Sequence, residues 1–448
     1  MVRVALRFIA VLLLPALVGC ATHADQLVKV RAFYQAGDLA AAEHLLDDDL
    51  KKAKSDGDVL KLEQAMVRLA AGKPKETEQI LRQVRDRFDE LDKPTAGETA
   101  WSMLSDDNRR SYAGEDYEKV LIRSMLALSN LMTDGEDAVA YAHQITAKQQ
   151  EIIAAAAVDD GNADKDGQNP KLAYKQVALG PYIHGMLREE THVDYADAAR
   201  AYQQVVYFEP EFRTGRWDLE RARNGHHSER GHGALYVFAL VGRGPYKVET
   251  LEAPSTAALL IADVVLKSQN KYSLPTSVAP VKVPKVVAMP NDIDNVLVSI
   301  GGQQAAQTET ITDVGRMAVE QYEAVYPQVV ARAVVRRIVK RGVVEGTKLA
   351  TGVDDKSALN LLFEAAEFGW GAAEAADTRC WGLLPDKIQV CRIELPVGEH
   401  VVSLSPAQGE RTIGVAEQTT VRIVDGGNTY VLANFPDRKL VGKVLVSR

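Results

Sequence analysis

The spacing of apolar residues divides the chain into two parts. Over residues 25–224, apolar side chains recur every three or four positions among Ala, Leu, Glu, Gln and Arg, which predicts amphipathic helices. From Ala234 onward, Val, Ile and Thr become frequent between Gly and Pro turn signals, which predicts strands. The pattern therefore predicts an α+β, multidomain protein, with helices in residues 20–230 and a β-rich domain in residues 231–448.

The helical part contains a recurring arrangement. Residues 34–46 place Gly37-Asp38 before a helix, and residues 69–81 repeat that arrangement. The most complete copy, residues 194–210, resembles the second helix of a tetratricopeptide repeat, with small Ala198, aromatic Tyr202 and a terminating proline. Because the copies are unevenly spaced, we predict an irregular, tetratricopeptide-like α-solenoid, with a generic helical bundle as the alternative.

The β-rich part is predicted to contain short strands around an inserted helical block at about residues 308–377. Strand candidates are residues 234–241, 246–251, 281–287, 296–300, 387–395, 395–404, 411–415, 419–424, 429–433 and 440–446. We expect Thr312-Asp313 to cap the helical block and Pro327 to kink or split it. The Leu395-Pro-x-Gly-x-His400 phrase resembles periplasmic β-sandwich modules of the PEGA type, which implies a β-sandwich-like region.

The first twenty residues have the pattern of a targeting signal. A short basic segment, the apolar run 8–14 and a proline precede Gly19-Cys20, so residues 1–19 are predicted to be a signal peptide. The end of this segment resembles a bacterial lipobox, which implies cleavage before Cys20 and acylation of that residue; an ordinary signal peptide is the alternative. Ala21 implies an outer-membrane lipoprotein facing the periplasm, by resemblance to enterobacterial sorting.

The remaining cysteines bear on the same compartment. Cys380 and Cys391 are separated by a segment with a Pro-Asp turn signal. In an oxidising periplasm we expect them to form a disulfide, and two buried free thiols are the alternative. Two cysteines without nearby histidines are at most half of a zinc site.

Charge and hydropathy exclude two broad classes of protein. The chain has 53 Lys and Arg against 61 Asp and Glu, a net charge of −8. Residues 20–230 contain 28 basic and 38 acidic residues, whereas residues 231–448 contain 23 of each. Neither part has the basic excess on which nucleic-acid binding relies, so we expect no nucleic-acid partner. Past residue 20 no apolar run reaches the length of a bilayer span, which argues against a polytopic membrane protein.

Motifs give little support to an enzyme. Ser268-x-x-Lys271 matches the first motif of penicillin-binding enzymes, but the Ser-Asp-Asn and Lys-Thr-Gly motifs do not follow it at sensible distance. The chain has no nucleophile elbow, Walker sequence or His-Glu-x-x-His. Residues 162–173 begin like a calcium loop, but Ala173 occupies the position of the bidentate glutamate, so a solvated loop is the preferred interpretation.

Three histidines raise the question of a metal. His226, His227 and His232 lie in one polar stretch between the two parts and could hold a transition metal. A flexible, solvated linker is the preferred interpretation. We therefore expect no metal, no cofactor and no catalytic residue.

Three phrases in the β-rich part resemble an uncharacterised family of proteobacterial outer-membrane lipoproteins. They are residues 242–248 (Gly-Arg-Gly-Pro-Tyr-Lys-Val), 311–332 and 377–385 (Asp-Thr-Arg-Cys-Trp-Gly-Leu-Leu-Pro). The family has no assigned activity, and its members often lie near lipoprotein activators of cell-wall synthases. The resemblance implies a place in the cell envelope.

These observations favour a lipid-anchored periplasmic scaffold or adaptor that binds an envelope protein partner. We expect this protein not to be an enzyme. Its acidic solenoid is expected to offer a groove, with Tyr182 and Tyr202 either as aromatic anchors for the partner or as core between repeats. One alternative is an enzyme acting on envelope polymers with two convergent carboxylates. Another is a membrane-docking sensor or transport component that uses the basic face of residues 329–344, formed by Arg332, Arg336, Arg337, Lys340 and Arg341.

Overall fold

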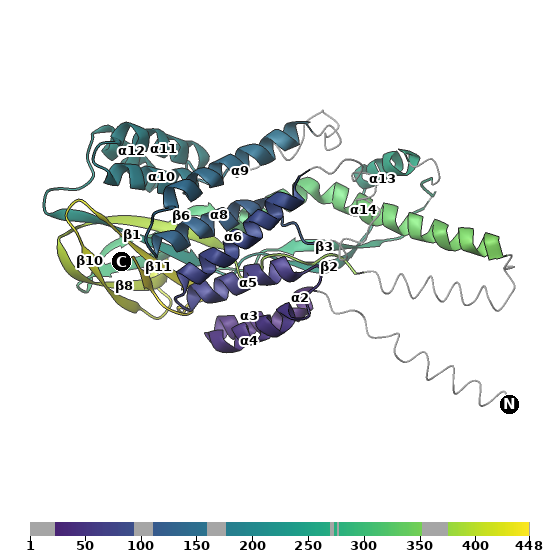
Figure 1. Ribbon diagram of the computed structural model, residues 1–448, viewed down its shortest axis with the longest axis horizontal. Coiled ribbons are helices and arrows are strands. Elements are labelled where there is room, and N and C mark those ends of the chain that lie inside the picture. Colours follow the sequence, from purple (N-terminus) through teal and green to yellow (C-terminus); the bar gives the residue numbers. More distant parts are fainter. Residues whose placement is uncertain are drawn as a thin grey trace.

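Helices and strands occupy separate stretches of the chain, as the sequence predicts. The structure, a computed structural model, describes residues 23–93, 111–158, 176–268, 273–275, 277–351 and 375–447. In these residues a layer of helices lies against a β unit built from two sheets, and a helix and strand extension projects from one end (Figure 1). The predicted mixed α+β class is confirmed. Among the described helices, none has the length and apolar character needed to cross a membrane.

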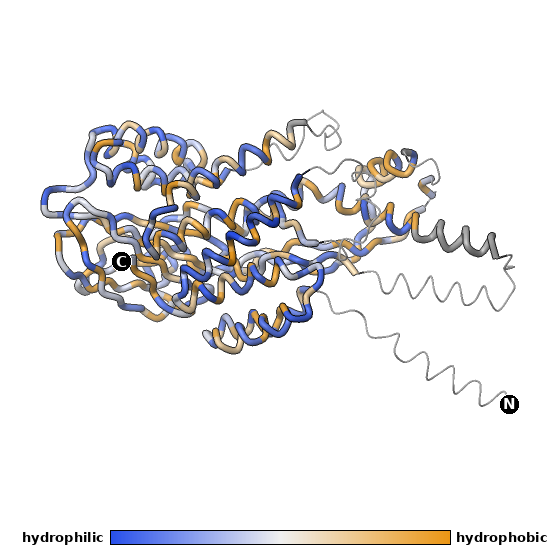
Figure 2. The backbone as a smooth tube through the Cα atoms, viewed as in Figure 1, coloured by the Kyte–Doolittle hydropathy of each residue, from blue (hydrophilic) through white to orange (hydrophobic). Residues whose placement is uncertain are grey.

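The helices that precede the first strand pack in chain order. They are α2 (His23–Gln26), α3 (Val28–Ala36), α4 (Leu39–Leu50), α5 (Gly57–Ala70), α6 (Pro74–Leu91), α8 (Asp116–Leu131), α9 (Ala138–Val158), α10 (Leu179–Glu190), α11 (Tyr195–Phe208) and α12 (Arg213–Arg223). From α3 to α12, each helix contacts the next one described along the chain. Apolar and polar positions alternate along them (Figure 2), as expected for helices that bury one face.

Local signals in the sequence set several helix boundaries. Asp38 caps α4, because its carboxylate accepts a hydrogen bond from the Ala41 backbone N–H at 3.0 Å. Gly37, with a φ of 82°, ends α3 in the left-handed conformation that glycine adopts without strain. Pro74 occupies the first turn of α6, where its missing N–H costs no hydrogen bond. The Gly-Asp turn predicted before α4 is therefore confirmed.

The strands form two larger sheets and a two-stranded ribbon. They are β1 (His232–Val241), β2 (Tyr246–Glu252), β3 (Val281–Val287), β4 (Asn295–Ile300), β5 (Gln303–Gln307), β6 (Glu309–Asp313), β7 (Lys387–Pro396), β8 (Gly398–Gln408), β9 (Arg411–Thr412), β10 (Glu417–Ile423), β11 (Asn428–Phe435) and β12 (Leu445–Val446). The orders are β12-β11-β1-β7-β6 and β10-β8-β4-β5, with β9 beside β8, while β2 pairs with β3. Most predicted strands are present, although residues 411–415 and 440–446 keep only two strand residues each.

Strand β1 lies at the centre of the five-stranded sheet, with both faces buried. It runs parallel to β11 and antiparallel to β7. One face of β1 contributes to a core shared with the helices, through Ala234, Tyr236, Phe238 and Leu240. The other face contributes to the core between the two sheets, through Leu235, Val237, Ala239 and Val241. The apolar run of β1 is thus explained, and one core joins the two parts that the sequence distinguishes.

The helical block, predicted at about residues 308–377, begins at α14 (Val314–Thr351), because residues 309–313 form β6. Its predicted cap is confirmed, because the Asp313 carboxylate accepts a hydrogen bond from the Arg316 backbone N–H at 2.9 Å. Pro327 lies inside α14, which continues through it, so the predicted split does not occur. Helix α14 packs on β3 and on α13 (Thr256–Ser268) through a third apolar cluster, which includes Val283, Val330 and Val334.

Candidate binding cleft

A cleft of about 490 Å³ lies where five segments of the chain meet. Its lining comes from Leu91 at the end of α6, from residues 111–115, which precede α8, from the β2–β3 ribbon, from α14, and from residues 375–379. This volume is in the range of ligand pockets, about 300–1,000 Å³. The cleft is therefore large enough to accept a small molecule or a short stretch of polypeptide.

Cations outnumber carboxylates in this cleft. Its basic residues are Lys247, Lys282, Arg332, Arg336 and Arg379, and its acidic residues are Glu115 and Asp377. Lys247 forms an ion pair with Glu115, and Arg379 forms one with Asp377 at 2.6 Å. Lys282 pairs at 3.0 Å with Glu249, outside the cleft lining. Both acids of the lining are thus already neutralised, and the surplus charge of the cleft is positive.

The pKa shifts agree with this distribution of charge. Burial alone would raise the pKa of Glu115, but Lys247 holds it below its usual value. The pKa of Asp377 is likewise lowered despite burial, chiefly by Arg379. Burial would lower the pKa of Lys247, but Glu115 and Asp377 raise it above its usual value. All three groups are therefore charged near neutral pH, and the ion pairs in the cleft are intact.

Helix α14 contributes two arginines to the cleft lining. Arg332 and Arg336 are one turn apart, both are partly buried, and both line the cleft. Within the part of the chain that the structure describes, no ion pair involves Arg332. Arg337, the next residue after Arg336, is exposed instead and donates to the Pro280 carbonyl oxygen at 2.7 Å. The predicted basic face of this helix is therefore divided between the cleft and the surface; the side chains of Lys340 and Arg341 lie outside the described residues.

Two buried glutamates hold the wall formed by residues 375–383 against the helices. Glu63 on α5 accepts the backbone N–H groups of Gly382 at 2.7 Å and Leu383 at 2.8 Å. Glu118 on α8 accepts the N–H of Trp381 at 2.7 Å and the hydroxyl of Tyr112. Burial raises the pKa of Glu63 to about 7 and also raises that of Glu118. These carboxylates stabilise the cleft wall and do not line the cleft.

Close backbone packing fixes the other side of the cleft. The Gly244 N–H donates to the Leu384 carbonyl oxygen at 2.8 Å, and a Cβ on Gly244 would lie 2.3 Å from that oxygen. Only glycine allows this approach, which positions Lys247 three residues later. Two of the phrases that suggested a family, residues 242–248 and 377–385, therefore meet beside the cleft.

The structure does not place Tyr182 and Tyr202 on a surface. Both side chains are fully buried, with ring centroids 5.9 Å apart, and Tyr182 also contacts Phe212 and Tyr236. The Tyr202 hydroxyl donates to Glu189 at 3.1 Å. Their prediction as partner-binding anchors is wrong, because their helical faces turn toward neighbouring helices and β1. The alternative interpretation, core between helices, is confirmed.

The predicted disulfide is also absent. Cys380 and Cys391 are both free and buried. Strand β7 directs Cys391 into the core between the two sheets, whereas the charged neighbours of Cys380 include Glu118 and Lys247, on the helix side. Burial raises the pKa of each thiol to about 12, so both are protonated and unreactive near neutral pH. Cys20, the predicted lipidation site, lies outside the described residues, as do Lys271 and the calcium-like segment at residues 162–173.

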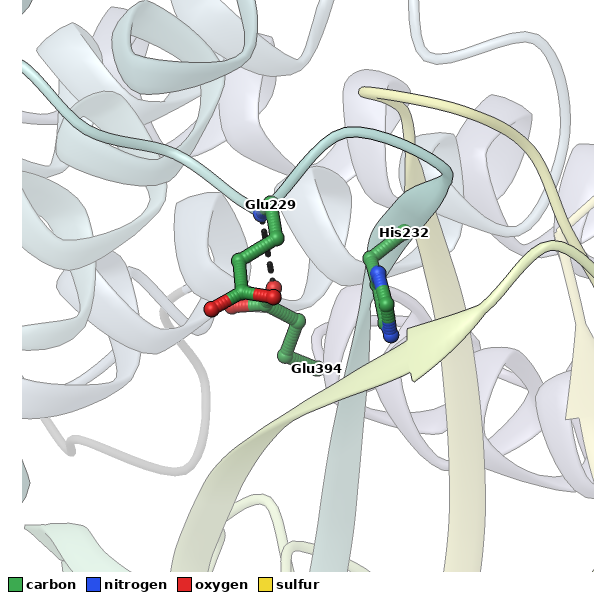
Figure 3. Close-up of side chains that lie close together, drawn as sticks. All are labelled: Glu229, His232 and Glu394. Atoms are coloured by element: carbon green, nitrogen blue, oxygen red, sulfur yellow. Dashed lines mark hydrogen bonds between the residues drawn. The ribbon is translucent and has the colours of Figure 1, made fainter.

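The three histidines of the polar stretch do not converge. His226 is exposed, while His227 is buried and lies 2.9 Å from Asn428 and 3.0 Å from Ser228. His232 instead lies beside Glu229 and Glu394 (Figure 3). Sequence reasoning missed Glu394, because only the pairing of β7 with β1 brings it to this position. The acidic Glu229, three residues before His232, was the available signal.

Comparison with known proteins finds no matching family model, curated protein or solved structure.

Proposed function

We propose that this protein is a lipid-anchored periplasmic adaptor and that its basic cleft binds an acidic segment of an envelope protein. The observation that carries the proposal is the cleft itself, whose lining holds five cations and two carboxylates, with both carboxylates ion-paired and Arg332 in no ion pair among the described residues. Charge of one sign in a concave site attracts the opposite charge and raises the rate of encounter. The proposed partner surface is therefore acidic, and we propose that the partner binds in the basic cleft instead of the acidic groove expected from the sequence.

The anchor and the family assignment complete the proposal. The lipobox-like end of the signal sequence supports acylation of Cys20 and attachment to the outer membrane. The chain-order packing of α3 to α12 supports a tetratricopeptide-like solenoid, and the three matched phrases support membership of the outer-membrane lipoprotein family. Together they favour a scaffold that holds a partner close to the membrane.

The paired state of the cleft carboxylates favours binding over catalysis. An enzyme that hydrolyses glycans needs one carboxyl group that keeps a proton and another that is free to act as base or nucleophile. Glu115 and Asp377 are instead both ion-paired, with lowered pKa values. This arrangement supports an adaptor without catalytic activity.

A peptide-binding experiment tests the role of the cleft. A fluorescent oligoglutamate peptide is titrated with the full chain, and fluorescence anisotropy reports binding. We expect Arg332→Glu to weaken binding at least about tenfold, since it replaces an attractive charge with a repulsive one. Lys285→Glu is the matched control, because Lys285 is exposed on β3 and is not part of the cleft lining. Equal weakening by both substitutions would show that the cleft has no special role.

Photo-crosslinking identifies the partner in the cell envelope. A photoreactive residue at Val325, in the cleft, is expected to trap one defined envelope protein through an acidic segment. The control position is Val264, which is 69% exposed on α13. Recovery of the same products from both positions, or of none from Val325, would contradict the proposal.

A further inference from the structure

Three side chains with metal-binding chemistry converge at the start of β1. One potential ligand atom from each of Glu229, His232 and Glu394 lies within 4.8 Å of the others. Glu229 belongs to the turn that leads into β1, His232 is the first residue of β1, and Glu394 projects from β7 toward them (Figure 3). None of these residues lines the basic cleft, so the cluster is a separate feature of the molecule.

Backbone hydrogen bonds hold the cluster in place. The Glu229 N–H donates to Glu394 Oε1 at 2.7 Å, and the His232 N–H donates to the Glu229 carbonyl oxygen at 3.0 Å. Between them, the Gly231 N–H donates to Asp425 at 2.8 Å. Strand pairing fixes Glu394 opposite Ala234, two residues beyond His232. The turn and the strand therefore present the three side chains in a defined geometry without help from a ligand.

Some groups of this cluster lack an ion-pair or hydrogen-bond partner among the described residues. Over the described ranges, neither Glu229 nor Glu394 has a basic side chain within ion-pairing distance, although the two carboxylates are close together. The Nδ1 atom of His232 is buried and has no hydrogen-bond partner among the described groups. Two neighbouring carboxylates repel each other, and a buried imidazole nitrogen without a partner is costly. A bound cation would offset the repulsion between the carboxylates, and coordination through Nδ1 would also give the buried imidazole nitrogen a partner.

We propose that Glu229, His232 and Glu394 bind a divalent transition-metal ion, with zinc as the best-matched ion. One imidazole and two carboxylates suit zinc, whereas calcium and magnesium prefer ligand sets made only of oxygen. Ligands about 2.1 Å from a tetrahedral zinc ion lie about 3.4 Å apart, so the three ligand atoms, now within 4.8 Å of one another, would move closer together on binding. Water completes the coordination.

Calorimetry with zinc alone tests the site. The full chain, without a polyhistidine tag and after treatment with a chelator, is titrated with ZnCl₂. We expect one zinc ion per chain, with affinity at least about tenfold lower in His232→Ala and in Glu394→Gln, because even residues that merely support a metal ligand contribute tenfold or more. His226→Ala is the matched control, since this exposed histidine lies outside the cluster, and it should bind zinc like the wild type.

A second measurement guards against loss of folding and against binding elsewhere. Glu229→Gln changes an exposed side chain and is expected to fold normally while binding zinc more weakly. Thermal unfolding without metal should give similar midpoints for all variants, and zinc should raise the midpoint of the wild type and of His226→Ala only. Absence of saturable binding to the wild type, or equal binding by His232→Ala, would overturn the proposal. Oligoglutamate binding by these variants should be unchanged, so this site and the cleft can fail independently.

Discussion

The two faces of the five-stranded sheet are buried by different chemistry. Against the second sheet, the face with Val237, Cys391 and Phe435 meets aliphatic side chains such as Val298 and Leu404. Against the helices, the opposite face meets tyrosines and a network of buried ions, in which Arg221 contacts Glu189 at 2.8 Å and Asp218 at 2.6 Å. The core between the two sheets is thus mainly apolar, with a few buried neutral polar groups such as Gln389, whereas the helix-covered core combines apolar packing with paired charges.

This difference predicts which side of the sheet makes the stability of the protein depend on pH. Apolar burial depends little on pH, because it removes hydrocarbon from water without changing any protonation state. Buried ions depend on pH and on every partner remaining in place. We therefore expect mutations on the helix-covered side to lower stability more, and in a pH-dependent way, than mutations in the core between the two sheets.

The largest effect is expected from removal of the cation in the ion network. Arg221→Ala leaves the carboxylates of Glu189 and Asp218, which are 0% and 1% exposed, without the cation that pairs with both. Breaking a buried pair in this way costs about 3–5 kcal/mol. Urea unfolding of the variant measures this loss. The control is Arg223→Ala on the same helix, whose side chain is 51% exposed and whose ion pair with Glu220 should contribute less than about 1 kcal/mol.

Acidification should reveal the contribution of His23. Burial lowers the pKa of His23 from 6.5 to about 4, and neither ring nitrogen has a hydrogen-bond partner in the described structure. On acidification the unfolded chain therefore gains the proton first, and the free energy of unfolding falls between about pH 6.5 and 4, by about 3 kcal/mol in all.

His23→Phe should remove this contribution to the pH dependence while preserving burial. The free energy of unfolding is measured by urea at pH 7 and 4.5 for variant and wild type. Glu63 acts with the opposite sign, because its raised pKa means that its stabilising contribution declines as the pH rises from about 4.5 to 7. The difference between variant and wild type isolates His23, and identical slopes in the two proteins would refute the assignment.

A truncation in the core between the two sheets should lower stability less, and by an amount that does not depend on pH. Val237→Ala removes two methyl groups from a fully buried position and is expected to cost about 2 kcal/mol. The same loss should be measured at pH 7 and at pH 4.5. Val401→Ala, at a side chain that is 50% exposed on β8, should change stability by less than about 0.5 kcal/mol. A strong pH dependence for Val237→Ala would break the comparison between the two faces.

The smallest effect concerns the two thiols. Cys391→Ala should cost about 1 kcal/mol, as expected for loss of one buried sulfur atom without a broken crosslink. In native wild-type protein, a maleimide should label neither Cys380 nor Cys391, whereas in urea without reductant it should label both. Mass spectrometry counts the adducts. Labelling that requires a reductant would show that the thiols are bonded to each other.

Structural features that depend only on residues close together in the sequence were predicted well. The Asp313 cap and the apolar alternation of strands such as residues 281–287 depend on neighbouring residues, so their predicted positions agree with the structure. The partners of these strands could not be predicted, because Ala234 pairs with Asn428 and Glu394 across long stretches of sequence. Periodicity identifies which residues form a strand, but it does not identify the neighbouring strand.

For the candidate sites too, the sequence identified residues but not their spatial neighbours. The basic residues on α14 were visible in the sequence, but the direction of Arg332 into a cleft depends on packing against the ribbon and on residues 375–379. Tyr182 and Tyr202 were identified as important aromatics, yet only the helix contacts show which way they face. For Cys380 and Cys391, proximity in the sequence was misleading, because strand β7 directs Cys391 to the face of the sheet away from the helices.

The parallel pairing of β1 with β11 has a consequence for how the polypeptide is made. The central strand of the sheet receives one neighbour only after residues 428–435 have been synthesised, near the end of translation. Until then, one edge of an apolar strand is open to other chains, and long-range pairing of this kind forms slowly. A protein truncated before residue 428 should therefore aggregate or be degraded, even though every described helix is still encoded.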